Sequence, residues 1–224
     1  MIASFDENKS FEYENGFYLT SEPYRIGNIL SHYELYKKII DIPGVVIELG
    51  VFKGGSLIQF ATFRELLENE KSRKIIGFDI FGKFPQVNFV NSDTNFVEKW
   101  NNDFEEEILT KRDLEKAIVN KGFNNIELIE GNILSTVEEY LKKYPYTRIA
   151  LLHIDTDVYE PAKKGLELLY ERIVPGGLLV LDDYGTIEGE TLAVEEFFEG
   201  QNIEIHKMRF SHSKPSYIVK EKFA

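Results

Sequence analysis

The sequence predicts an α/β fold in which a mostly parallel sheet is covered by helices on both faces. Short β-branched and apolar runs alternate along the chain with longer segments whose apolar residues recur at helical spacing, and this alternation is typical of consecutive strand–helix units. No linker divides the 224 residues, of which 43% are hydrophobic. We therefore expect a single domain with a sizeable core over residues 1–224.

Seven segments are expected to form the strands. Five are short apolar runs that would make the parallel part of the sheet, at residues 45–49, 74–79, 126–132, 148–157 and 176–185. The other two lie near the C-terminus, at residues 203–210 and 216–222. They are typical of a closing hairpin, which would place an antiparallel strand at one end of the sheet.

Apolar residues at a spacing of three and four predict the helices. The expected segments are residues 22–40, 54–70, 111–123, 137–145, 161–173 and 191–200. Pro161 stands in the first turn of one of them, where the missing N–H costs no hydrogen bond. The first of these helices belongs to residues 1–42, which we expect to form an N-terminal helical lid.

Residues 84–110 have no clean period and are expected to form an irregular, lid-like insertion. Five aromatic side chains are scattered along it: Phe84, Phe89, Phe96, Trp100 and Phe104. They would either stack on a ligand beneath them or simply pack the lid or a contact between subunits. The aromatic-rich N-terminal segment likewise hints at a homodimer or a larger oligomer.

The composition excludes several classes of protein. The chain has 38 acidic and 26 basic residues and a net charge of −12, which argues against general binding to nucleic acid or to an anionic membrane. It has no cysteine, and its four histidines lack the spacing of a zinc motif. No apolar run approaches the ~20 residues of a membrane helix, and the N-terminus lacks the layout of a secretory signal. A cytoplasmic location fits these features.

A loop with three glycines follows the first strand, in the stretch VIELGVFKGGS at residues 46–56. Gly50, Gly54 and Gly55 let the backbone approach a ligand, and the next helix offers free N–H groups. The loop has neither the spacing of a dinucleotide site nor the ending of a P-loop. Glu48 would repel a pyrophosphate, so a nucleoside cofactor with a cationic or amine end is the better guest. Asp79, at the end of the second strand, can accept hydrogen bonds from a ribose or can cap a turn.

Four aspartates follow the fourth and fifth strands: Asp155, Asp157, Asp182 and Asp183. If these strands are neighbours, the carboxylates crowd one edge of the sheet, where like charges ~4 Å apart repel by about 4 kcal/mol at an effective dielectric of 20. Such a cluster needs a cation, a shared proton or water. Oxygen ligands without histidine or cysteine suit Mg²⁺, Mn²⁺ or Ca²⁺. The alternative is that the four are turn and cap residues that point apart.

Taken together, these motifs resemble those of class I S-adenosylmethionine-dependent methyltransferases, and more narrowly the macrocin O-methyltransferase (TylF-like) family. The resemblance covers roughly residues 43–185, and its carriers are VIELGVFKGGS, GFDIFGKFP, IELIEGN, LLHIDTDVYE and GGLLVLDDYG. It implies a Rossmann-like, doubly wound fold and transfer of a methyl group to a sugar hydroxyl. The acceptor would be a nucleotide-linked sugar or a glycosylated natural product.

The resemblance also implies roles for the matching residues. The methionine part of the cofactor would be wrapped by Glu48, Gly50, Val51, Phe52, Gly54, Gly55 and Ser56. The ribose would be held by Asp79, beside Ile80 and Phe81, and the adenine flanked by Gly131, Asn132 and Ile133. Asp155 would border the cofactor and, with Asp182 and Asp183, bind a divalent cation, expected to be Mg²⁺. Asp157 would be the general base, with Asp155 as the other catalytic residue.

Two positions depart from the family's pattern, because Thr156 replaces a glycine and His153 an arginine. Three rival functions stay open beside the metal-dependent sugar O-methyltransferase. One has the same cofactor and metal but a catechol-like phenol as the acceptor. Another is a non-catalytic cofactor-binding domain of the same fold. An NAD-dependent oxidoreductase is disfavoured by the glycine spacing.

Overall fold

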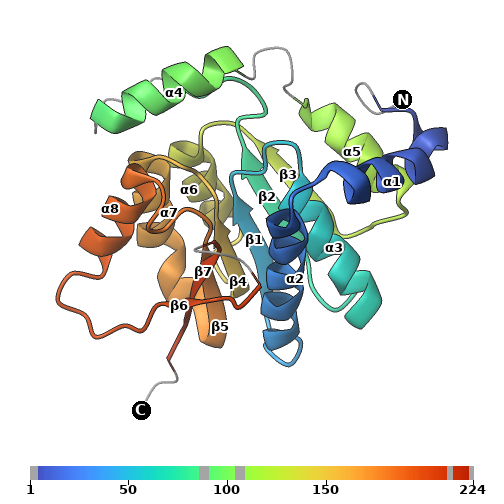
Figure 1. The fold of residues 1–224 in the computed structure, drawn as a ribbon. Coiled ribbons are helices and arrows are strands. Elements are labelled where there is room, and N and C mark those ends of the chain that lie inside the picture. The colour runs from blue at the N-terminus through green and yellow to red at the C-terminus, as the bar shows by residue number, and fades with distance from the viewer. Residues whose placement is uncertain (1–4, 86–90, 104–108, 211–213, 222–224) are drawn as a thin grey trace.

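The computed structural model describes residues 5–85, 91–103, 109–210 and 214–221. Its described residues form a seven-stranded sheet in the order β3-β2-β1-β4-β5-β7-β6 (Figure 1). The parallel strands are β1 (Val45–Leu49), β2 (Ile75–Asp79), β3 (Ile126–Glu130), β4 (Ile149–Ile154) and β5 (Ile173–Leu181). The antiparallel strands are β6 (His206–Lys207) and β7 (Ser216–Val219). The predicted fold class is therefore confirmed.

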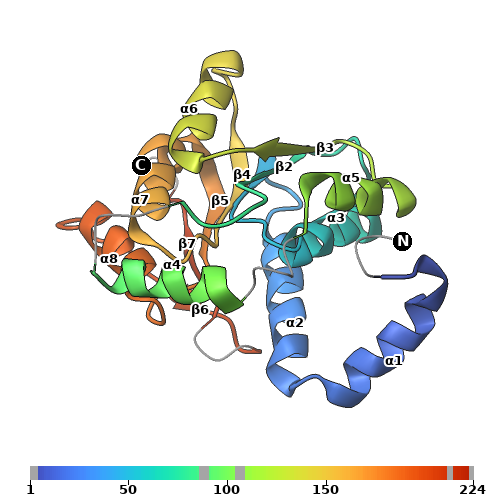
Figure 2. The ribbon, with the colours of Figure 1, turned by 90° about the horizontal axis from the view of Figure 1, so that it is seen from above.

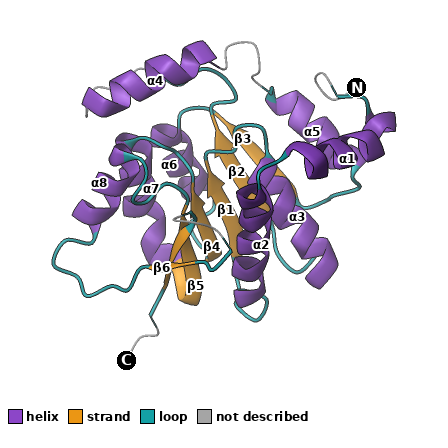
Figure 3. Cartoon of the chain, in the orientation of Figure 1, coloured by secondary structure: helices purple, strands orange, loops and turns teal. Residues whose placement is uncertain are grey.

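Helices cover both faces of the sheet (Figure 3). One face packs against α2 (Pro23–Lys38), α3 (Gly55–Leu67) and α5 (Lys111–Asn120). The other face packs against α6 (Ile133–Lys143), α7 (Tyr159–Leu169) and α8 (Glu188–Phe197). Side chains alternate across each strand, so Val46 of β1 joins the first layer and Ile47 the second. Both are fully buried, which explains why this strand is apolar at successive positions and does not alternate between apolar and polar residues there.

The switch in strand order places the site. The chain runs from β1 outward through β2 to β3, and then returns to the other side of β1 with β4 and β5. The carboxyl ends of β1 and β4 therefore lie side by side, with connections leaving in opposite directions. In open α/β sheets this arrangement creates a crevice for a ligand.

Two helices were not assigned individually from the sequence, although α1 (Ser10–Thr20) lies in the segment expected to be helical. α1 has no buried residue, and Figure 2 shows it projecting from the body of the molecule. α4 (Asn91–Asp103) occupies part of the region expected to be irregular, so that expectation was wrong for these residues. The short 3₁₀ helices η1 (Glu7–Lys9) and η2 (Tyr170–Arg172) complete the described elements. The predicted Phe89 and Phe104 lie outside the described residues.

Helix α2 is largely a core element. Leu35 and Tyr36 of this helix, and Ile39 directly after it, are fully buried among the residues that cover β1. Only residues nearer its N-terminus, Arg25, Asn28 and His32, line the cavity described below. Helix α2 therefore packs on the sheet and also borders the cavity, and the expected lid over residues 1–42 stays a prediction.

Candidate active site at the carboxyl ends of the strands

A cavity of about 720 Å³ opens at the carboxyl ends of the parallel strands. Its volume lies within the range typical of small-molecule and cofactor sites. Most of the residues expected to bind the cofactor line it: Gly50, Val51, Phe52, Gly55, Ser56, Asp79, Ile80, Gly131, Asn132, Ile133 and Asp155. The other three, Glu48, Gly54 and Phe81, are buried outside its wall.

The glycine loop is tied to the strands on both sides of β1. Gly50 donates its N–H to the carbonyl of Phe78 at 2.9 Å, and the N–H of Asp155 donates to the carbonyl of Leu49 at 2.9 Å. Gly50 has a φ of +85°, and a Cβ there would lie 1.8 Å from the carbonyl oxygen of Asp155. Only glycine fits this position, because a side chain would meet both the steric cost of a positive φ and the backbone of Asp155, directly after β4.

Asp79 organises the same loop from the end of β2. Its Oδ2 accepts hydrogen bonds from the N–H groups of Val51 at 2.7 Å and Phe52 at 2.8 Å, and its Oδ1 accepts one from Phe81 at 2.5 Å. Three backbone donors fix this carboxylate in place. Asp79 thus caps a turn and also lines the cavity, and its contact with a ribose stays a prediction.

Glu48 lies beneath the loop, fully buried on the α2 and α3 side of β1. Its Oε1 accepts hydrogen bonds from the hydroxyl of Ser56 and from Nδ1 of His153, the latter at 3.0 Å. Burial lowers the pKa of His153, but the facing carboxylates of Asp182 and Glu48 outweigh it and hold that pKa well above 6.5. Glu48 therefore positions Ser56 and His153 from below.

Three of the four aspartates meet at the ends of β4 and β5. These strands are neighbours, and a carboxylate oxygen from each of Asp155, Asp182 and Asp183 lies within 4.8 Å of the others. Burial, followed by the charge of Asp182, raises the pKa of Asp155 well above 3.8. The pKa of Asp182 falls to about 2 because His153 and Lys214 outweigh its burial. Oδ2 of Asp183 is buried and has no hydrogen-bond partner among the described residues.

Asp157, two residues after Asp155, lines the same cavity. Its backbone has a φ of +61°, an uncommon conformation for a residue other than glycine. Burial raises its pKa to about 7, with Lys214 opposing and Asp182 reinforcing that rise. A carboxyl group with a pKa near neutrality can exchange a proton at physiological pH.

Lys214 is a site residue that the sequence did not indicate. It precedes β7, and its Nζ forms ion pairs with Oδ1 of Asp183 and, at 3.7 Å, with Oδ2 of Asp182. The chain thus brings its own cation to the acidic cluster.

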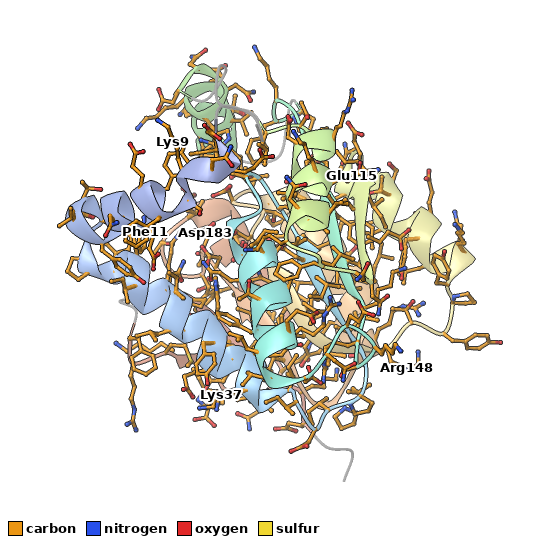
Figure 4. All side chains as sticks on the ribbon, turned by 90° about the vertical axis from the view of Figure 1, so that its right-hand side faces the viewer. Lys9, Phe11, Lys37, Glu115, Arg148 and Asp183 are labelled. Atoms are coloured by element: carbon orange, nitrogen blue, oxygen red, sulfur yellow. The ribbon has the colours of Figure 1, made fainter. Side chains whose placement is uncertain are left out.

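Asp183 lies well inside the outline of the molecule in Figure 4, whereas Phe11 of α1 lies toward the edge.

The opposite end of the cavity is set by the turn between β3 and α6. Gly131 has a φ of +136°, and the side chain of Asn132 caps α6 by accepting a hydrogen bond from the N–H of Leu134 at 3.0 Å. Ile133, Asn132 and Gly131 all reach the cavity wall. The turn therefore offers an apolar surface and backbone polar groups side by side.

Aromatic rings cover part of the cavity. Trp100 of α4 stacks on Phe96 with ring centroids 5.7 Å apart and meets Phe52 of the glycine loop at 5.1 Å. Phe84 also packs against Trp100, at 6.0 Å, and both line the cavity. Asp93 holds α4 in place, because its buried carboxylate accepts a hydrogen bond from the N–H of Tyr159 at the start of α7.

Comparison with known proteins places this fold among the Rossmann-like methyltransferases. The solved structure of NovP, an O-methyltransferase, aligns with a TM-score of 0.74 at 20% identity, covering 88% of this chain and 81% of that one. That of CalS11, a calicheamicin methyltransferase, aligns with a TM-score of 0.69 at 25% identity, covering 97% and 88%. The family model for macrocin-O-methyltransferase (TylF) matches residues 32–210. The chain belongs to this family.

Curated relatives are named O-methyltransferases, and the name of one includes a sugar group. A tetracenomycin 4'-O-methyltransferase from Streptomyces olivaceus, whose named substrate carries a dimethoxyrhamnosyl group, is 28% identical over 146 residues, or 64% of this chain and 54% of that protein. The mycinamicin III 3''-O-methyltransferase of Micromonospora griseorubida is 27% identical over 147 residues, or 64% and 56%. The chain thus spans about half the length of these relatives. Within the described residues, no helix is both long and apolar enough to cross a membrane.

Proposed function

We propose that this chain is an S-adenosylmethionine-dependent and divalent-cation-dependent O-methyltransferase that acts on a sugar hydroxyl. Membership of the macrocin O-methyltransferase family supports the reaction class. The names of the relatives support a sugar on a natural product or on a nucleotide as the acceptor. The observation that carries the proposal is the acidic cluster of Asp155, Asp182 and Asp183, which lies in the wall of the same cavity as the glycine loop.

The cavity suits the cofactor along its whole length. The glycine loop presents backbone without side chains at Gly50 and Gly55. Asp79 places a fixed carboxylate where the hydroxyl groups of a ribose can donate hydrogen bonds to it. The turn at Gly131 and Ile133 supplies a surface for a flat base. When bound, S-adenosylmethionine supplies a methyl group on a sulfonium, which is the hard part of the chemistry.

The acidic cluster suits a hard divalent cation. Its three residues offer only oxygen ligands, their oxygens converge within 4.8 Å, and Oδ2 of Asp183 is buried without a hydrogen-bond partner among the described residues. Mg²⁺ binds through a few carboxylates and keeps sites for water and substrate. When bound, such a cation makes a sugar hydroxyl more acidic and holds it in place.

The residues of the chain have separate tasks in the reaction. Asp157, with a pKa of about 7, accepts the proton that the sugar hydroxyl loses as its oxygen forms a bond to the methyl carbon. The bound cofactor would supply the methyl carbon and would keep the electron pair of the carbon–sulfur bond on its sulfur. Phe84 and Trp100 shield this exchange from water and present faces on which a sugar can stack. Holding the two reactants in line supplies several kcal/mol of the acceleration.

The test is a methylation assay with purified protein, S-adenosylmethionine and a panel of nucleotide-linked sugars and glycosylated natural products. We expect S-adenosylhomocysteine release and a methylated sugar, both abolished by EDTA and restored by Mg²⁺. Asp182→Asn should abolish turnover while leaving cofactor affinity nearly unchanged. Methylation of catechols alone would show that the acceptor class is wrong. Turnover that survives EDTA and Asp182→Asn would overturn the role of the cation.

A further inference from the structure

A second group of potential metal ligands lies beside the acidic cluster. His32 of α2 and His153 of β4 face each other with ring centroids 5.3 Å apart and ring planes at 72°. A ring nitrogen of each histidine and a carboxylate oxygen of Asp182 all lie within 4.8 Å of one another. Only Asp182 belongs to both groups, so the histidine group is a distinct constellation of residues.

Each histidine has one ring nitrogen held by an acceptor. Nδ1 of His32 lies 2.7 Å from Oε1 of Gln59, and Nδ1 of His153 lies 3.0 Å from Oε1 of Glu48. An amide oxygen and a carboxylate can only accept a hydrogen bond, so Nδ1 carries the hydrogen in both rings. His32 is neutral near pH 7, because burial lowers its pKa to about 4, so its Nε2 is left with a lone pair. The facing carboxylates favour a proton on Nε2 of His153, and an ion would displace that proton to reach the second lone pair. Two such nitrogens, each with Nδ1 held by an outer carboxylate or carbonyl, are the arrangement found in metal-binding histidines.

Both Nε2 atoms are buried and lack hydrogen-bond partners among the described residues. Nε2 of His153 lies 3.8 Å from Oδ1 of Asp182, beyond hydrogen-bond distance. A buried polar atom without a partner costs about 1–3 kcal/mol. A proton on Nε2 of His153 would reduce this cost for His153, but the lone pair on Nε2 of His32 would still have no hydrogen-bond donor. A cation between the three residues satisfies both rings and Asp182 together.

We propose that His32, His153 and Asp182 form a second cation site, which takes a transition metal ion rather than Mg²⁺. Imidazole nitrogen binds ions such as Co²⁺, Zn²⁺ and Fe²⁺ far better than it binds Mg²⁺. Bonds to such an ion are about 2.0–2.2 Å long, so the three atoms must close up by roughly an ångström. His32 and Asp182 line the cavity, which gives the ion a path of entry.

The site does not depend on the proposed methyl transfer, because its ligands and its test stand without a cofactor or an acceptor. It shares one carboxylate with the acidic cluster, and Asp182 has two oxygens, one for each position. The two sites can be separated by mutation. His32 belongs only to the histidine site, and Asp183 belongs only to the acidic cluster.

The experiment is a titration of metal-stripped protein with Co²⁺, followed by visible absorption, and with Mg²⁺, followed by calorimetry. We expect a Co²⁺ spectrum typical of nitrogen ligation in the wild-type protein. His32→Gln should weaken Co²⁺ binding at least tenfold and leave Mg²⁺ binding unchanged. Asp183→Asn should do the reverse. His206→Ala is the matched control, since this histidine lies on β6, away from the cavity, and its loss should change neither titration.

His32 is almost fully buried, so its replacement can disturb the fold. A second variant separates the loss of a metal ligand from the loss of the fold. Gln59→Ala keeps both histidines and removes only the acceptor that orients His32, and it should weaken Co²⁺ binding about 10- to 100-fold. Circular dichroism establishes that each variant is folded. The proposal is overturned if folded His32→Gln and Gln59→Ala bind Co²⁺ as the wild type does. It is equally overturned if Asp183→Asn removes Co²⁺ and Mg²⁺ binding together, because Co²⁺ would then occupy the all-oxygen site.

Discussion

Replacing Lys214 by methionine should strengthen Mg²⁺ binding. In the structure the ammonium group forms ion pairs with Asp183 and, at 3.7 Å, with Asp182, two of the three residues of the acidic cluster. Before a divalent cation can use those oxygens, the ammonium must release them. Methionine has a similar length and no charge, so Lys214→Met removes the competitor without opening a large void.

The magnitude follows from the surroundings of the ion pair. A hydrogen bond to a charged group contributes about 1.5–3 kcal/mol. The side chain of Lys214 is 38% exposed and is rehydrated when it leaves, whereas that of Asp183 is only 1% exposed. Solvent screening therefore reduces the net cost of release to about 1–2 kcal/mol. Since 1.4 kcal/mol is a factor of ten in an equilibrium constant, Mg²⁺ affinity should rise about 5- to 30-fold.

The assay is calorimetric titration of the metal-stripped protein with Mg²⁺. Lys142→Met is the matched control, because Lys142 pairs with Glu138 on the surface of α6 and is 72% exposed. This control should bind Mg²⁺ as the wild type does. Equal or weaker Mg²⁺ binding by folded Lys214→Met would refute the reasoning, since it would mean that the ammonium does not compete for the cluster.

Three further predictions concern the loop and the buried acids. Gly50→Ala should lower the free energy of unfolding by about 3 kcal/mol or more, because alanine there has a strained φ and overpacks its surroundings. Gly55→Ala, with open space around its Cβ, should leave the free energy of unfolding unchanged. Urea denaturation that shows equal stability for the two variants would contradict this prediction. Asp79→Asn should lose one charge-assisted bond, about 1.5–3 kcal/mol, and speed hydrogen exchange at Val51, Phe52 or Phe81; unchanged exchange would argue against the role of Asp79 in the loop. The melting temperature of Glu190→Gln should equal that of the wild type near pH 4.5 and exceed it by ~2 °C or more at pH 8. A difference between the two melting temperatures that does not grow with pH would count against this prediction.

The sign of the Glu190 prediction follows from its burial. Burial, together with the charges of Asp182 and Asp157, raises the pKa of Glu190 well above 4.5 in the folded chain. As the pH rises above about 4.5, the unfolded chain releases this proton first, so the folded wild type loses stability up to its own pKa. Glutamine cannot titrate and keeps the hydrogen bond that Oε1 accepts from the N–H of Asp183 at 3.0 Å.

The sheet was predictable because its central strands are short, buried on both faces and therefore mostly apolar, with Glu48 in β1 and His153 in β4 as the exceptions. β1 has the predicted bounds at Val45–Leu49, and the predicted neighbours β4 and β5 are adjacent. α4 was missed because its apolar residues, Phe96, Val97 and Trp100, make only a narrow stripe on a polar helix. α1 was missed because it buries no residue, so its sequence shows no apolar face at helical spacing.

The site was predictable only where topology alone decides it. The aspartates after β4 and β5 must meet, since parallel neighbours end at the same edge. Lys214, His32 and Gln59 come from elements far away in the sequence, and no local pattern shows that they converge. Glu48 was expected beside the cofactor, but side chains alternate across a strand, and Glu48 points into the layer beneath the loop, where Ser56 and His153 engage it.

The proposed methyltransferase is tested most directly by calorimetric titration of the metal-stripped chain with S-adenosylhomocysteine and then with Mg²⁺. We predict cofactor-product binding that persists in EDTA, and a separate Mg²⁺ heat that disappears in Asp182→Asn. An absence of S-adenosylhomocysteine binding would contradict the assignment of the glycine loop, and a Mg²⁺ heat that survives in Asp182→Asn would contradict the acidic cluster as the cation site.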